Sequence, residues 1–190
     1  MKKNKLIDKA FELIDIHGWS GFSLLILAKE EKLTVTEIKI FFDSKRSLLT
    51  EFSKMIDKRV ESKIDLEDLH VSAPKDNLFE LIMMRFEEME SYKKPLKKIL
   101  TSKKIKTIDL TIISRNILNS LDFYMELSNA YSKSHVDLLK KKGLFLIYSL
   151  SFRVWLNDKT EDLSKTMSQL DKLLTLAEKI SKKLTNFPIF

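Results

Sequence analysis

The chain contains very few of the two residues that most often interrupt regular structure. Only 3 of its 190 residues are glycine and only 3 are proline. The turns of a sheet depend on these residues, whereas helices can be joined by short polar loops without them. Hydrophobic residues make up 44% of the chain, enough to build a buried core. The sequence therefore predicts an all-α protein of one or two domains.

Composition also excludes several kinds of site and location. Cysteine is absent, so the chain has no disulfides, thiol nucleophiles or thiolate metal sites. Its apolar runs are short and interrupted by charge, and the basic N-terminus lacks the apolar segment of a signal peptide. We therefore expect a cytoplasmic protein without membrane-spanning helices. The net charge of +7 permits binding to nucleic acid or to an anionic membrane surface and specifies neither.

Residues 5–55 contain the signals of four helices. The first helix is expected to end at Gly18, a glycine in the position of a left-handed C-cap. Ser23 is the predicted N-cap of a second helix, and Thr34-Val-Thr-Glu37 has the form of a capping box that opens a third. A long fourth helix follows Phe42-Asp-Ser-Lys45. A tight turn between the second and third helices indicates a helix-turn-helix.

Residues 27–45, LAKEEKLTVTEIKIFFDSK, begin with Leu27-Ala28 and end with Phe42-Asp-Ser-Lys45. This pattern resembles the DNA-binding domain of TetR-family regulators. Two positions depart from it, because Lys32 stands where the family has the glycine of the turn and Lys39 where it has a phosphate-binding tyrosine. The resemblance implies a TetR-like all-α fold and a homodimeric transcriptional regulator that binds an operator DNA. It also implies an N-terminal helix-turn-helix domain of residues 1–50.

The third helix and its flanks are expected to contact the duplex. The predicted DNA-binding residues are Ser23, Thr34, Val35, Thr36, Glu37, Lys39, Lys45 and Arg46. A lysine can bind phosphate and a threonine can touch phosphate or base. Glu37 escapes repulsion by phosphates only if its carboxylate stays in the cap or accepts from a cytosine amine. The alternative is that this segment merely packs a three-helix core, since a fold does not fix a function.

Residues 51–190 are predicted to form a helical ligand-binding and dimerisation domain, which brings the chain to about nine helices. HVSAPKDN, residues 70–77, reads as a loop. Methionine and aromatic side chains recur at helical spacing, and such a stripe builds either an ordinary core or an apolar pocket. A pocket would suit a hydrophobic small molecule or a lipid. Its candidate residues are Met83, Phe86, Met89, Phe123, Tyr124, Tyr148, Phe152 and Trp155.

The last helix carries an apolar stripe that recurs every three or four residues. Its expected role is a dimer interface, half of a four-helix bundle across a two-fold axis. The residues of this interface are Leu163, Met167, Leu170, Leu174 and Ala177. The terminal residues NFPIF, 186–190, could dock on the body of the protein or on a membrane.

Residues 142–179 contain a tyrosine, then Trp-Leu-x-Asp, an acidic residue, a threonine and Leu-Asp-Lys. In this sequence the positions are Lys142, Tyr148, Trp155, Leu156, Asp158, Asp162, Thr166, Leu170 and Asp171. The order resembles the C-terminal region of the Coq-nine family, the lipid-binding accessory proteins of ubiquinone biosynthesis, which also have a TetR-like fold. This second resemblance implies the alternative function. The protein would then hold an isoprenoid or other lipid near ubiquinone-making enzymes and would not read DNA.

No constellation of residues indicates catalysis. His17, His70 and His135 stand alone, and Glu67-x-x-His70 lacks the second Glu-x-x-His that a di-iron site requires. The sequence has no HExxH, Walker loop, GxSxG or dinucleotide-binding loop. We therefore expect no enzymatic activity, no metal and no cofactor.

Overall fold

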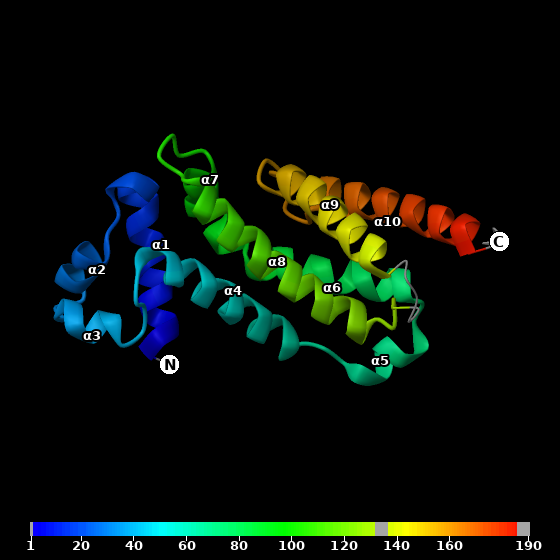
Figure 1. Cartoon of the computed structure of the whole chain (residues 1–190), viewed down its shortest axis with the longest axis horizontal. Coiled ribbons are helices and arrows are strands. Elements are labelled where there is room, and N and C mark those ends of the chain that lie inside the picture. Colours follow the sequence, from blue (N-terminus) through cyan, green and yellow to red (C-terminus); the bar gives the residue numbers. More distant parts are fainter. Residues whose placement is uncertain (1, 132–136, 186–190) are drawn as a thin grey trace. The chain divides into compact units, whose positions relative to one another are not determined.

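The computed structural model describes residues 2–131 and 137–185, and within these ranges all regular structure is helical (Figure 1). This confirms the predicted all-α fold. The segment NFPIF lies outside the described residues. In chain order the elements are α1 (Lys2–Gly21), α2 (Leu24–Glu30), α3 (Val35–Lys39), α4 (Lys45–Glu61), α5 (Leu66–Val71), α6 (Pro74–Glu88), the 3-10 helix η1 (Glu90–Tyr92), α7 (Lys93–Leu100), α8 (Thr107–Leu127), α9 (Asp137–Trp155) and α10 (Ser164–Thr185).

The helix that sequence reasoning did not foresee is α5. Asp65 caps it by accepting a hydrogen bond from the Glu67 N–H at 2.9 Å. The segment 70–77, expected to be a loop, is helical at both ends. It begins in the last residues of α5 and ends in α6, whose first residue is Pro74. Proline is well suited to that position, where its missing N–H would have no partner in any case. Among the described helices, none is long and apolar enough to cross a membrane.

The chain divides into two compact units that interleave in sequence. Unit 1 consists of Met1–Glu61 and Glu88–Ile117, and unit 2 of Ser62–Glu87 and Leu118–Phe190. Unit 1 thus combines α1 to α4 with η1, α7 and the first half of α8. Unit 2 contains α5, nearly all of α6, the second half of α8, α9 and α10.

The core of unit 1 is built around three aromatic rings from α1, α4 and η1. Phe11 and Phe52 stack with ring centroids 4.2 Å apart, and Tyr92 meets both of them edge-on at 5.3 and 5.0 Å. The Tyr92 hydroxyl donates to the carboxylate of Asp8. Burial and this hydrogen bond raise the pKa of Tyr92 to about 12. The ring cluster therefore joins segments that are far apart in the sequence.

Helix α1 bends near its end at Gly18, whose φ is 68° and ψ 168°. The predicted left-handed glycine is present, but the helix does not end there, because one further turn runs through Gly21. This added turn carries Trp19 into the core of unit 1, where 4% of the residue is exposed. The bend matters because Trp19 forms part of the site described below.

A buried carboxylate secures the connection between α9 and α10, which pack against each other in unit 2. Asp158 accepts hydrogen bonds from the N–H and hydroxyl of Thr160 at 3.0 and 2.6 Å. It accepts two more from the N–H and hydroxyl of Thr166 at 2.9 and 2.7 Å. Burial alone would raise the pKa of Asp158, but the four hydrogen bonds outweigh it and hold the pKa well below its usual value.

Replacing Asp158 by Ala should destabilise the protein by about 3 kcal/mol, because four donors in the turn lose a charged acceptor. Urea unfolding followed by circular dichroism measures this cost. Glu161→Gln, an exposed carboxylate in the same connection, is the matched control and should change stability by less than about 0.5 kcal/mol. Equal effects of the two substitutions would show that the hydrogen bonds do not secure the turn.

The same carboxylate predicts a pH dependence. Its pKa is lower in the folded protein than the value of about 3.9 expected in the unfolded chain. Its stabilisation is therefore complete above that pH and is lost as the pH falls below it. We expect Asp158→Asn to unfold with a shallower pH dependence than the wild type on the acid side.

Candidate nucleic-acid interface

The segment from Ser23 to Phe42 folds as the helix-turn-helix that the sequence predicted, with α2 and α3 side by side (Figure 1). The Ser23 side chain caps α2 by accepting a hydrogen bond from the Ile26 N–H at 3.3 Å. Between the helices, Lys32 has a φ of 54°, a conformation that glycine adopts more readily. The lysine thus keeps the left-handed turn at a cost in backbone strain.

The predicted capping box of α3 is present. The Thr34 hydroxyl oxygen accepts from the Glu37 N–H at 3.2 Å, and the Glu37 carboxylate accepts from the Thr34 N–H at 2.8 Å and from its hydroxyl at 2.9 Å. The hydrogen bond from the Thr34 backbone, followed by that from its hydroxyl, lowers the pKa of Glu37. The carboxylate is therefore ionised and engaged at the start of α3. Of the two ways in which Glu37 could avoid phosphate repulsion, the fold shows the cap.

Helix α3 has a buried face and an exposed face. Ile38 and the nearby Phe42 are fully buried, so they fix the helix in the core of unit 1. Thr36 and Lys39 are exposed, and Val35 is half-buried. The two interpretations of this segment thus concern different side chains, because some pack the core while others remain available to a duplex.

Two further side chains near α3 were not foreseen. Ile40 is 76% exposed, and Lys2 lies close enough to Glu37 for its charge to act on that carboxyl group. Ile40 could have been found from the sequence, because burial of Ile38 and Phe42 leaves the residue between them pointing outward. Lys2 could not have been found in this way, because its position depends on how α1 packs.

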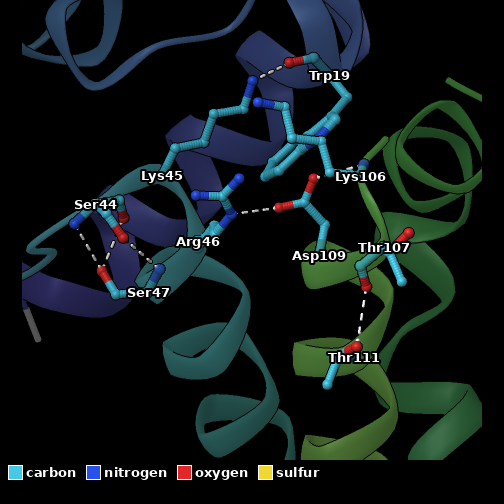
Figure 2. A network of polar contacts seen from close by, with 9 residues as sticks. All are labelled: Trp19, Ser44, Lys45, Arg46, Ser47, Lys106, Thr107, Asp109 and Thr111. Carbon is cyan, nitrogen blue, oxygen red and sulfur yellow. Dashed lines mark hydrogen bonds and ion pairs between the residues drawn. The ribbon is translucent and has the colours of Figure 1, made fainter. Parts of the chain in front are cut away.

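Lys45, predicted to bind phosphate, instead bonds within unit 1 (Figure 2). Its ammonium group donates to the carbonyl oxygens of Trp19 and Phe22, the latter at 2.9 Å, and lies 4.0 Å from the centroid of the Trp19 ring. Burial lowers the pKa of Lys45, and the opposing charge of Asp109 offsets only part of this effect. Lys45 therefore holds the start of α4 to the end of α1, and its contact with DNA stays a prediction.

Arg46 forms an ion pair with a carboxylate from α8. Its Nε donates to Asp109 at 2.6 Å, and Asp109, which is 3% exposed, also accepts from the Lys106 N–H at 2.9 Å. Burial would raise the pKa of Asp109, but hydrogen bonds from the Lys106 backbone and from Arg46 lower it below its usual value. The predicted DNA contact of Arg46 is likewise untested.

An open depression of about 390 Å³ surrounds this network in unit 1. Its lining residues are Trp19, Ser20, Ser44, Lys45, Arg46, Lys104, Lys106 and Asp109. Sequence reasoning did not single out Lys104 or Lys106, although the sequence contains a signal for them. Residues 93–106 hold seven lysines and no acidic residue.

The aromatic residues predicted to line a pocket pack against one another in unit 2. Phe86, Tyr148, Phe152 and Trp155 have ring centroids 5.1 to 6.2 Å apart. Beside them lies a buried cation, Arg85, whose Nε donates to the Tyr148 hydroxyl at 3.2 Å. These contacts describe a packed aromatic cluster, and an open pocket at this place stays a prediction.

The other predicted pocket residues do not all belong to that cluster. Met83 and Tyr124 are buried and Phe123 is half-buried, all three in unit 2. Met89 is buried in unit 1. The helical spacing of Met89 with Met83 and Phe86 could not reveal this difference, because α6 ends at Glu88 and the chain then enters the other unit.

The predicted dimer stripe is largely buried within one chain. Leu163, Leu170 and Leu174 are 6%, 0% and 4% exposed, and Met167 and Ala177 are half-buried. Other apolar side chains of α9 and α10 are exposed: Leu138, Leu139, Leu146, Leu150, Leu176 and Ile180. A second copy of the chain would meet this exposed set before it met the buried leucines.

Solved structures with the same fold include two bacterial proteins. A TetR transcriptional regulator from Nitrosomonas europaea ATCC 19718 superposes with a TM-score of 0.77 at 18% identity, over 94% of this chain and 98% of that one. A TetR transcriptional regulator from Rhodococcus sp. RHA1 gives 0.60 at 15% identity, over 90% and 92%. No protein-family model and no curated protein sequence matches the chain. The fold is therefore that of TetR regulators, whereas these two structures lend no support to the Coq-nine resemblance.

Replacing Lys32 by Gly should stabilise the protein by about 0.5–1 kcal/mol, because glycine adopts the positive φ of the turn without strain. Urea unfolding measures the change. Lys29→Gly is the matched control, since Lys29 is exposed within α2, and it should cost about 1 kcal/mol. Loss of stability in both variants would show that the turn is not strained at Lys32.

Proposed function

We propose that this protein is a homodimeric DNA-binding transcriptional regulator. The observation that carries the proposal is the exposed face of α3, where Thr36 and Lys39 stand outward on a helix anchored by Ile38 and Phe42. The likeness of the fold to two TetR transcriptional regulators supports it. Because a fold by itself does not fix function, the test must address these side chains.

The chemistry of this face suits the major groove of DNA. Lys39 offers a charge to a phosphate, and Thr36 offers a hydroxyl to a phosphate or a base edge. Ile40 offers an apolar surface of the kind that contacts a thymine methyl group. The carboxylate of Glu37 is already engaged by Thr34, and Lys2 adds a positive charge nearby. The repulsion between Glu37 and the duplex is thereby reduced.

Dimerisation is required for such a regulator, because two recognition helices must reach major grooves about 34 Å apart. The exposed leucines of α9 and α10 support this part of the proposal. Burial of apolar side chains of this size against a second copy would stabilise the pair by about 25 cal/mol for each Å² removed from water. We propose that Leu146, Leu150, Leu176 and Ile180 belong to the interface, alongside the exposed edges of Met167 and Ala177.

The aromatic cluster of unit 2 is where we propose that a hydrophobic effector acts, by favouring one spacing of the two recognition helices. The lipid-binding alternative has no observation of its own. Two of the positions that carried the Coq-nine resemblance, Asp158 and Thr166, bond to each other in the α9–α10 connection. Two others, Tyr148 and Trp155, are packed in the aromatic cluster. All four residues stabilise unit 2, which accounts for their presence without a role in lipid binding.

Thr36→Ala together with Lys39→Ala should weaken binding to a duplex selected from random sequences by at least about tenfold, at about 1–3 kcal/mol for each specific contact. Loss of the lysine should also reduce the salt dependence by about one phosphate contact. Fluorescence anisotropy at several salt concentrations measures both effects. Lys58→Ala, an exposed lysine of α4, is the control and should leave affinity unchanged. Failure of the wild type to enrich any duplex would end the proposal.

Leu146→Glu together with Leu150→Glu should convert the dimer to a monomer, because two charges would be buried without partners at the interface. Sedimentation velocity distinguishes the two species. Val71→Glu is the control, since Val71 is 90% exposed on α5, and it should remain a dimer. A wild type that is monomeric at micromolar concentration would contradict the proposed assembly.

A further inference from the structure

The depression in unit 1 is lined by no residue of α3, and the proposed DNA contacts of Thr36, Lys39 and Ile40 do not involve it. We propose that this depression, lined by Trp19, Ser20, Ser44, Lys104 and Lys106 among others, binds the phosphate group of a small phosphorylated molecule. The inference does not depend on the proposed function, because none of the residues that define the site belongs to α3.

The charge of the lining favours an anion. Four of its side chains are cationic and one is a carboxylate. That carboxylate, Asp109, is already engaged by Arg46 at 2.6 Å. The ammonium groups of Lys104 and Lys106 have no ion pair or hydrogen bond among the described residues. The charges of Arg46 and Asp109 cancel, so the site keeps an excess of positive charge. The charges of Lys104 and Lys106 are available to a ligand.

Hydroxyl groups supply neutral donors at the same place. Ser44 accepts a hydrogen bond from the Ser47 N–H at 3.1 Å, which leaves its own hydroxyl hydrogen available. The hydroxyls of Ser20 and Ser102 lie 3.1 Å apart, and only one of them can donate along that line. The wall thus offers O–H donors beside the two ammonium groups, a combination that suits the several acceptor oxygens of a phosphate.

The cations of the site are compatible with phosphate. Arginine forms paired N–H contacts with carboxylate and phosphate alike, and lysine binds phosphate as a point charge. The arginine of this site directs its Nε to Asp109, and Lys45 donates to the carbonyl oxygen of Trp19 (Figure 2). Lys45 also donates to the carbonyl oxygen of Phe22. The cations left for a ligand are lysines, which can bind a phosphate as point charges.

The depression has room for a molecule larger than an inorganic ion. Its volume of about 390 Å³ lies within the range of sites for small organic ligands, about 300–1,000 Å³. Because the phosphates of a DNA backbone share the same chemistry, the experiment must separate the two sources of the group.

Isothermal titration calorimetry of the full chain with inorganic pyrophosphate tests the proposal, at an ionic strength matched with chloride. The wild type should bind saturably with one site per chain. Lys104→Gln together with Lys106→Gln should weaken this binding by at least about tenfold, because two charge-assisted contacts are removed. The matched control, Lys94→Gln together with Lys103→Gln, removes the same charge from exposed lysines of the same segment outside the depression. It should bind within about twofold of the wild type.

Heat that does not saturate, or equal weakening in the two double variants, would overturn the proposal, provided that circular dichroism shows all variants folded. Thr36→Ala with Lys39→Ala should bind pyrophosphate like the wild type, which separates this site from the DNA-reading face. Binding of pyrophosphate that persists in the presence of a saturating selected duplex supports a small-molecule ligand. Competition by the duplex, with loss of duplex affinity in Lys104→Gln/Lys106→Gln, would instead assign the phosphate to DNA and overturn it.

Discussion

The ammonium group of Lys45 fixes the part of the molecule on which the candidate DNA-reading surface depends. It lies against the Trp19 ring and donates to the carbonyl oxygens of Trp19 and Phe22 at the end of α1. The chain leaves α1 at Gly21 and returns at Lys45, with α2 and α3 in between. Holding these two ends together closes the loop that contains both helices, which removes the loop-closure part of the entropy cost of placing α3. The orientation of the exposed side chains therefore rests on a contact outside α2 and α3.

Local signals in the sequence were sufficient for the caps of α2 and α3, although they did not reveal α5 or the last turn of α1. Ser23, Thr34 and Glu37 act within three residues of their partners, so their hydrogen bonds follow from spacing alone. Contacts over long sequence separations could not be predicted in this way. Arg46 and Asp109 are 63 residues apart, and nothing in either neighbourhood indicates the other. The sequence therefore predicted the helices that form the candidate site. The fold was needed to identify the partners of its basic residues.

Some acidic side chains are engaged by neighbours in the sequence and others by residues far along the chain. Several carboxylates serve the fold itself: Glu37 caps a helix, Asp109 receives Arg46 and Asp158 holds the connection between α9 and α10. Hydrogen bonds keep the pKa of each below its usual value, so all three remain ionised at neutral pH. Acidic groups engaged in this way are less available to screen lysines elsewhere. The segment 93–106 has seven lysines and no acid of its own, and Glu90 and Asp15 from outside the segment pair with Lys93 and Lys98.

The interleaving of the two units limits how this fold can be divided or recombined. A fragment that stops after α4 would contain the whole helix-turn-helix but would lack Tyr92 and Asp109, which come from the second segment of unit 1. Its exposed aromatic rings would favour aggregation over independent folding. The helix-turn-helix of this protein is therefore not a unit that can be transferred by itself. Gene fusion or shuffling that exchanged it alone would require matching residues in η1 and α8 of the recipient.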